Sequence, residues 1–156
     1  MSHRPVSVSR HIAAPAAAIF GLLADPARHP ELDGSGMLQA NRSGPAPLAL
    51  GDRFSMDMKI SGLPYRVTSE VTELEPDARI AWQPWMRVAG RRVMGGVTWR
   101  YALAPEGDGT LVTETYDVTT GRGSHLLSAL GFPTRMEQAM RTTLEHLAAI
   151  VEPVPA

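Results

Sequence analysis

Glu114 is the residue whose position in this sequence points most clearly to chemistry. The segment around it has the pattern of a strand, with apolar residues at every second position, namely Val112, Tyr116 and Val118. Glu114 falls on the same face by this alternation. Burial there would raise the pKa of its carboxyl group, so that it could act as a general acid or base or bind a ligand hydroxyl. Two alternatives stay open: a bulge reverses the alternation, or Glu114 pairs with an arginine such as Arg100 on the outer face.

His29 is the second candidate for catalysis, because imidazole titrates near neutral pH and can serve as a general base. It lies beside Pro30 in a segment that we expect to border the mouth of a cavity. The alternative is an ordinary surface histidine. Tyr101 and Tyr116 are the candidate proton donors that would act with Glu114 or His29.

Metal and cofactor chemistry finds no support in the sequence. Cysteine is absent, which excludes thiol nucleophiles and cysteine-based metal sites. His3, His11 and His146 have no partner at the spacing of metal ligands, and His125 begins the last helical segment, where a structural role is expected. We therefore expect no metal and no cofactor.

Apolar residues on several expected strand faces could line a ligand cavity. One face combines Phe54, Met56, Met58 and Ile60; a second combines Ile80, Trp82 and Met86; a third combines Val93, Val97, Trp99, Tyr101 and Leu103. The final helix adds Met136 and Met140. Methionine adapts to varied apolar shapes, which suits a binding surface. The alternative for each of these residues, Tyr116 included, is ordinary core packing.

These residues depend on elements that the sequence pattern predicts in order. We expect a strand at 6–12, a helix at 16–25 and a second short helix at 26–32. Six strands with short turns between them follow, near 37–43, 52–61, 64–74, 79–88, 92–104 and 110–119. The final helix carries its apolar residues in a helical rhythm up to Val151, with Leu126, Leu127 and Leu130 as an earlier extension. Short turns favour an antiparallel sheet, so the fold class is α+β.

Two local features refine this sheet. Gly95 and Gly96 fall inside the expected strand at 92–104 and suggest a bulge or a sharp bend. On the strand at 64–74 the polar residues alternate with apolar ones and should form a solvated face that carries surface ion pairs: Arg66, Thr68, Glu70 and Thr72.

Composition limits the kind of protein this is. The chain has 156 residues, 44% of them hydrophobic, and a formal net charge of −1. That charge gives no reason to expect binding to nucleic acid, and no apolar run approaches the length of a membrane span. We expect one domain over 1–152, a disordered tail over 153–156, and a cytoplasmic location.

Four motifs resemble those of a known superfamily. They are Ala13-Ala14-Pro15-(x)4-Phe20-(x)4-Asp25-Pro26, Gly51-Asp52-Arg53-Phe54, Val71-Thr72-Glu73-Leu74-Glu75-Pro76-(x)3-Ile80-Ala81-Trp82, and Gly109-Thr110-Leu111-Val112-Thr113. In order and spacing they are similar to the START-like, Bet v 1-like helix-grip superfamily (SRPBCC), and within it to the polyketide cyclase/dehydrase group. Members usually carry an aromatic residue shortly after the Asp-Pro pair, where this chain has His29.

The resemblance implies a helix-grip fold: a curved antiparallel sheet of about seven strands around one long C-terminal helix, with two short helices after the first strand. It also implies a cavity between sheet and helix that binds a hydrophobic, polyketide- or lipid-like molecule. A fold of this kind hosts several functions, so two alternatives remain. One is a polyketide cyclase/dehydrase with a pocket acid or base. The other is a partner-binding protein, toxin-like or chaperone-associated, with an incidental cavity. A homodimer is left open.

Overall fold

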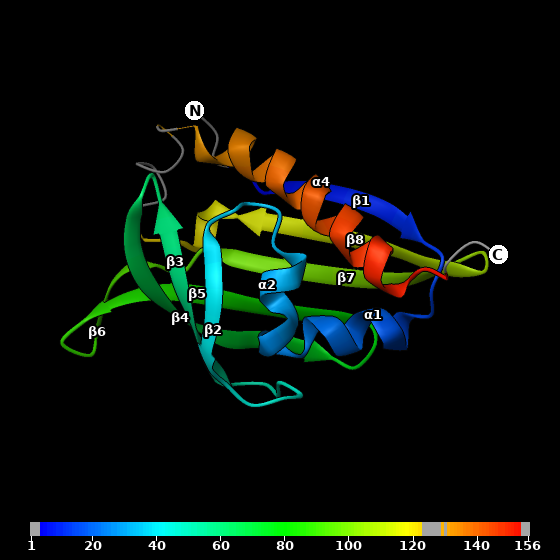
Figure 1. Ribbon diagram of the computed structural model, residues 1–156, viewed down its shortest axis with the longest axis horizontal. Helices are drawn as coiled ribbons and strands as arrows, with labels where there is room; N and C mark the ends of the chain where they lie inside the picture. The colour runs from blue at the N-terminus through cyan, green and yellow to red at the C-terminus, as the bar shows by residue number, and fades with distance from the viewer. Residues whose placement is uncertain (1–3, 123–128, 130, 154–156) are drawn as a thin grey trace.

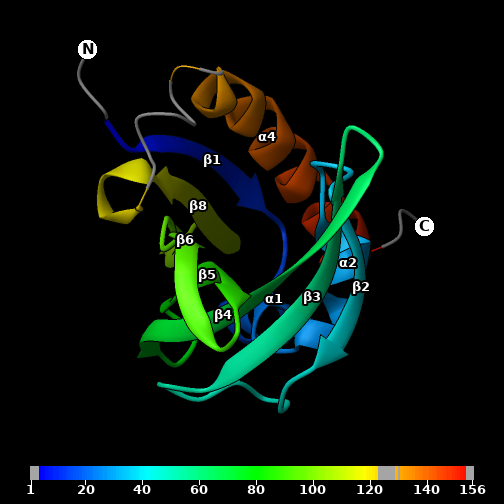
Figure 2. The same cartoon turned by 90° about the vertical axis from the view of Figure 1, so that its left-hand side faces the viewer.

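An eight-stranded antiparallel sheet forms most of the molecule in the computed structural model, which describes residues 4–122, 129 and 131–153. Its strands are β1 (Val6–Ile12), β2 (Leu38–Ser43), β3 (Arg53–Ile60), β4 (Leu63–Glu75), β5 (Arg79–Val88), β6 (Arg91–Gly95), β7 (Thr98–Glu106) and β8 (Gly109–Asp117). The order across the sheet is β1-β8-β7-β5-β4-β3-β2, with β6 paired to β5 alone. The consecutive strands from β2 to β6, and β7 with β8, are neighbours, as the sequence predicts, whereas β7 pairs with β5 rather than with β6. The sheet curves strongly around α4 (Figures 1 and 2).

The strand expected at 92–104 is in fact two strands, β6 and β7. The break comes at Gly95, the last residue of β6, and Gly96, which have positive φ angles of +123° and +80°. A Cβ atom on Gly96 would lie 2.4 Å from the Trp85 ring, so glycine is required for space as well as for conformation. Because of this break, β6 does not continue the alternation of inward and outward side chains in β7. Met94 lines the cavity and Val93 does not, so the prediction that Val93 shares a face with Val97 and Trp99 was wrong. The β5–β6 hairpin therefore projects from one end of the sheet (Figure 1).

Short helices follow β1, as expected. In α1 (Ala16–Leu23), the residues that form the buried stripe are Ile19, Leu22 and Leu23. The predicted second helix consists of a 3-10 turn, η1 (Pro26–Arg28), and α2 (His29–Leu32). The carboxylate of Asp25 begins η1 by accepting a hydrogen bond from the Ala27 backbone N–H at 3.1 Å. This cap fixes the direction of the segment that carries His29.

The long helix α4 (Phe132–Val151) lies across the concave side of the sheet and packs against β1, β8 and α2 (Figure 1). Its buried stripe includes Met136, Met140, Leu144 and Leu147, close to the predicted face. The predicted extension through Leu126, Leu127 and Leu130, and His125 with it, lies outside the described residues. A second 3-10 turn, η2 (Val118–Thr120), follows β8. None of the described helices is long and apolar enough to cross a membrane.

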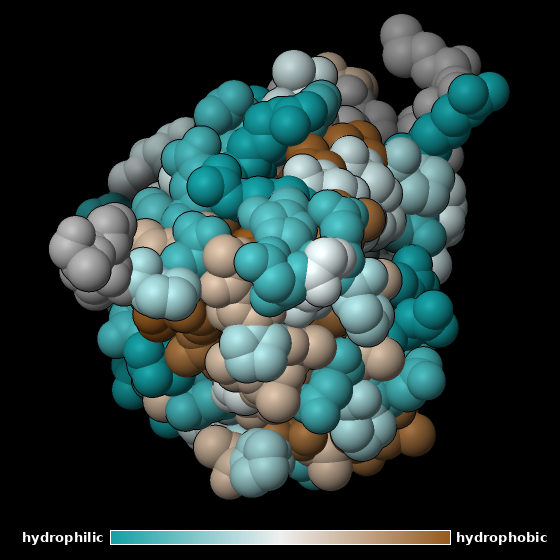
Figure 3. Space-filling model, turned by 90° about the vertical axis from the view of Figure 1, so that its right-hand side faces the viewer, coloured by the Kyte–Doolittle hydropathy of each residue, from teal (hydrophilic) through white to brown (hydrophobic). Residues whose placement is uncertain are grey.

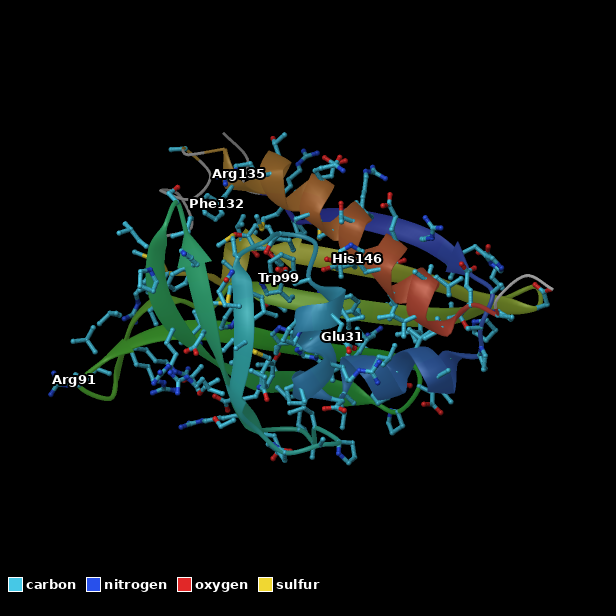
Figure 4. The ribbon with its side chains drawn as sticks, viewed as in Figure 1. Glu31, Arg91, Trp99, Phe132, Arg135 and His146 are labelled. Carbon is cyan, nitrogen blue, oxygen red and sulfur yellow. The ribbon has the colours of Figure 1, made fainter. Side chains whose placement is uncertain are left out.

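The loop between α2 and β2 is fastened to the middle of α4. The Gly34 backbone N–H donates to Thr143 Oγ1 at 2.9 Å. A Cβ atom at Gly34 would lie 2.4 Å from the Ala139 carbonyl oxygen, so only glycine permits this approach. His146 Nδ1 lies 3.2 Å from the Leu32 carbonyl oxygen, and the labelled side chain lies beside α2 in Figure 4. These contacts close the side of the molecule between α2 and α4.

Candidate functional site

A cavity of about 500 Å³ lies between the concave face of the sheet, α2 and α4. Most of the residues that could line a cavity according to the sequence are on its wall, including Phe54, Met56, Met58, Trp82, Trp99, Tyr101, Tyr116, Met136 and Met140. Ile80 and Leu103 are not; both are buried in the hydrophobic core instead. Trp99 points into the interior in Figure 4. The position of the lining residues is a fact of the structure, whereas their contact with a ligand stays a prediction. The volume and the apolar lining are typical of small-molecule sites.

Glu114 lies inside this cavity and is only 2% exposed. It is the direct cross-strand neighbour of Tyr101, whose hydroxyl donates to Glu114 Oε1 at 2.8 Å. The other oxygen, Oε2, is buried with no hydrogen-bond partner among the described residues. Both alternatives for Glu114 were wrong: β8 keeps its alternation, and Arg100 pairs with Glu73 on the outer face at 2.5 Å.

The carboxyl group of Glu114 is largely protonated at neutral pH. Burial raises its pKa from 4.5 to about 8, against the opposing effect of the hydrogen bond from Tyr101, and the negative charge of Asp33 adds to the rise. In this state the carboxyl carries a proton and can donate a hydrogen bond. The site therefore offers an acid whose free oxygen has no partner in the protein.

His29 is buried, 7% exposed, and lines the same cavity. The alternative that His29 is an ordinary surface histidine was therefore wrong. Its Nε2 lies 2.8 Å from the Leu23 carbonyl oxygen, which can only accept, so Nε2 carries the hydrogen and Nδ1 is free to accept. Burial lowers the pKa of His29 from 6.5 to about 4, so the ring is neutral at pH 7. The ring stacks on Trp82 with centroids 4.9 Å apart, much as an aromatic residue would.

Aromatic rings form a continuous part of the wall between these two groups. Trp82 packs against Tyr101 with centroids 5.6 Å apart, and Trp99 packs against Tyr116 at 4.7 Å. Burial raises the pKa of Tyr116 to about 12 and keeps its hydroxyl protonated. The wall thus combines apolar rings with hydroxyl groups that remain neutral donors.

The charges on the cavity wall have one sign. Asp33 and Glu114 are the acidic residues, and no lysine or arginine is among the described residues of the lining. Asp33 accepts hydrogen bonds from the backbone N–H groups of Ser35 and Leu38 and from the Ser35 hydroxyl. Across the ranges 4–122 and 131–153, no cluster of three histidine or acidic side chains could hold a metal ion.

Several lining residues were not nominated from the sequence. Tyr65 and Val67 belong to the inward face of β4, opposite Arg66, and their alternation with polar residues was the available signal. In the sequence, Asp33 and Ser35 indicate only a turn that ends a helix. They lie on the cavity wall because this turn packs against α4. Arg66 and Glu70 do lie on the outer face, where they pair with Asp57 and Arg92 of other strands.

Comparisons with known proteins agree with this architecture. A family described as polyketide cyclase / dehydrase and lipid transport matches residues 3–152. The uncharacterized protein Rv0088 of Mycobacterium tuberculosis is 45% identical over 150 residues, and the match covers 92% of this chain and 62% of that protein. This chain thus spans less than two thirds of the length of that relative.

Solved structures with low sequence identity share the fold. Protein CV1439 from Chromobacterium violaceum is 21% identical with a TM-score of 0.74, covering 97% of this chain and 99% of that one. The Aha1 dimer from Colwellia psychrerythraea is 14% identical with a TM-score of 0.65, covering 95% of this chain and 96% of that one. Because the family match extends over nearly the whole sequence, this chain belongs to the polyketide cyclase / dehydrase and lipid transport family.

Proposed function

We propose that the protein binds an uncharged, largely apolar molecule in its cavity, with one ligand oxygen hydrogen-bonded to Glu114. The observation that carries this proposal is the free Oε2 of Glu114 in a cavity otherwise lined by apolar and aromatic side chains. A buried polar atom without a partner costs roughly 1–3 kcal/mol. A ligand carbonyl or hydroxyl oxygen that accepts from Oε2–H removes that cost, and so does a bound water in the empty protein.

The charge of the lining supports an uncharged ligand. A carboxylate or a phosphate placed in the cavity would meet the negative charge of Asp33 and no described cation on the wall. Burial of an unpaired charge is strongly unfavourable. Ketones, phenols and alcohols of suitable size are therefore preferred over fatty acids and phospholipids.

Displacement of a fluorescent probe tests this proposal. Nile red, which is neutral, should bind with an increase in fluorescence, and decanol should displace it at concentrations roughly tenfold or more below those of decanoate at pH 7. Glu114→Gln keeps a donor and should preserve the affinity for decanol, whereas Glu114→Leu should lower it by about two- to tenfold. Equal displacement by decanol and decanoate would contradict the proposal. Native mass spectrometry of protein purified from its host, followed by extraction, would identify the natural ligand.

A second candidate function, a cyclase/dehydrase, is favoured by the protonation states of His29 and Glu114. In an aldol closure, Nδ1 of His29 takes a proton from the carbon beside one carbonyl, and this carbon forms a bond to a second carbonyl carbon. Glu114 then protonates the second carbonyl oxygen. Loss of water uses the two groups in reversed roles and returns both to their starting states. At pH 7 both groups are in the protonation states that this chemistry requires, a neutral imidazole and a protonated carboxyl group.

Deuterium exchange separates the enzyme from a simple binding protein. If His29 acts as a base, the protein should accelerate the exchange of the methyl protons of acetophenone with D₂O, and His29→Leu should abolish the acceleration. Glu114→Gln should reduce it, because an amide is a far weaker acid. If the protein binds Nile red but does not accelerate deuterium exchange, the enzyme function is contradicted and only the binding function remains.

A partner-binding function has weaker support. Among the described large apolar side chains, Leu50 and Ile150 are exposed and lie outside both the cavity lining and the β3–β4 and β5–β6 hairpins. A homodimer stays a proposal, since a dimer is described for the Colwellia protein. A cytoplasmic location also stays a proposal. Size-exclusion chromatography with light scattering, and fractionation of host cells, test them.

A further inference from the structure

Apolar side chains are exposed where the cavity reaches the surface. Leu63, at the turn between β3 and β4, is 68% exposed and also lines the cavity. Met94 of β6 does the same, and Val88 and Val93 extend the exposed apolar surface along the β5–β6 hairpin. Exposed apolar residues gathered at one site indicate an interaction surface. Figures 1 and 2 place these two hairpins and the first turn of α4 at the same end of the molecule.

The two hairpins also concentrate positive charge. The ranges 59–66 and 86–94 contain Lys59, Arg66, Arg87, Arg91 and Arg92 and no acidic residue, although the whole chain has a net charge of −1. Arg66 and Arg92 are paired with carboxylates of neighbouring strands. Lys59 and Arg91 have no carboxylate partner among the described residues, and the Arg91 side chain projects at the outer end of the hairpin in Figure 4.

The opposite end of the molecule differs. In Figure 3 its surface is mostly hydrophilic, and hydrophobic atoms appear there as small separate patches. Leu63 and Met94 combine exposure with a place on the cavity wall, whereas Leu50 and Ile150, which are exposed elsewhere, do not line the cavity.

We propose that these two hairpins dock on an anionic lipid bilayer, so that the mouth of the cavity faces the membrane. Val88, Val93, Met94 and Leu63 would enter the boundary between headgroups and acyl chains, while Lys59 and Arg91 contact anionic headgroups. An apolar ligand could then pass between bilayer and cavity without crossing bulk water, because Leu63 and Met94 belong to both surfaces. A bilayer of anionic lipids matches both properties of this surface, because exposed apolar side chains and the cations Lys59 and Arg91 lie on the same two hairpins.

Co-sedimentation with vesicles tests the docking surface. The full chain should bind vesicles of phosphatidylcholine and phosphatidylglycerol, and bind vesicles of phosphatidylcholine alone much more weakly, with a strong decrease at high salt. Each positive charge near an anionic surface contributes roughly a fivefold gain in affinity, so Lys59→Gln/Arg91→Gln should lower binding by roughly 25-fold. Val88→Ser should lower binding to both kinds of vesicle.

The chain offers matched controls for both substitutions. Leu50 is 64% exposed, as Val88 is, but lies between β2 and β3, outside the two hairpins, and Leu50→Ser should leave vesicle binding unchanged. Arg10, exposed on β1, controls for the loss of one charge: Arg10→Gln should leave vesicle binding nearly unchanged, whereas Arg91→Gln alone should lower it roughly fivefold. Equal effects of test and control variants, absence of vesicle binding, or indifference to phosphatidylglycerol would each overturn the proposal. Nile red binding in solution should be the same in all of these variants, which separates docking from binding in the cavity.

Discussion

Replacing Glu114 by glutamine should stabilise the protein, and by an amount that depends on pH. The pKa of Glu114 in the folded state is about 8, against 4.5 for an exposed glutamate. The folded state therefore binds the proton of Glu114 more tightly than the unfolded state does. Below pH 4.5 the carboxyl group is protonated in both states, and the free energy of unfolding then decreases as pH rises towards 8. At pH 7 the loss is about 3 kcal/mol, from about 1.4 kcal/mol for each pH unit between 4.5 and 7. Glutamine is neutral at every pH and avoids this loss.

Urea unfolding of the wild type and of Glu114→Gln at several pH values provides the measurement. The difference in unfolding free energy should grow by about 1.4 kcal/mol per pH unit from pH 5 to pH 7 and level off above pH 8. His29 opposes this trend in the wild type, because its lowered pKa makes the folded state gain stability as pH rises from 4 to 6.5. The comparison of two proteins that both contain His29 removes its contribution. Parallel pH profiles for the two proteins would refute the assignment of Glu114 as a buried neutral acid.

Three further substitutions have defined outcomes. His29→Phe keeps the stacking on Trp82 and removes the buried imidazole, so the loss of stability between pH 6.5 and pH 4 should become shallower by about 1.4 kcal/mol per pH unit in urea titrations. Phe54→Ala should lower the unfolding free energy by about 3–5 kcal/mol, since Phe54 is fully buried; a loss below 1 kcal/mol would show that the wall can collapse. Gly96→Ala should lower the thermal midpoint, because its Cβ would meet the Trp85 ring and its φ is positive; an unchanged midpoint would mean that the ring moves aside.

The sequence predicts the fold and most of the cavity wall because both follow from alternation. Phe54, Met56 and Met58 occupy every second position of β3, and a strand without a break keeps such residues on one face. The same rule places Glu114 inside. It fails for Val93, because the two glycines that follow reset the alternation in a way that only their backbone angles show.

Two features of the site depended on tertiary packing. His29 is buried because Trp82 and Phe54 close around it, and neighbouring residues in the sequence do not reveal that contact. The free Oε2 of Glu114 follows from the fact that Tyr101 reaches only one carboxyl oxygen. The sequence showed that a carboxyl would be inside but could not show which of its atoms would have a partner.

The fastening of the α2–β2 loop to α4 has a consequence for the kinetics of ligand exchange. The hydrogen bond from Gly34 to Thr143 and the close approach of Gly34 to the Ala139 carbonyl hold the side of the cavity shut. In the proposed binding function a ligand would leave between the β3–β4 and β5–β6 hairpins, and substitutions there would change its dissociation rate. Its equilibrium affinity depends instead on groups deep in the cavity, such as Glu114. Residence time and affinity can therefore change independently, each through substitutions in a separate part of the chain.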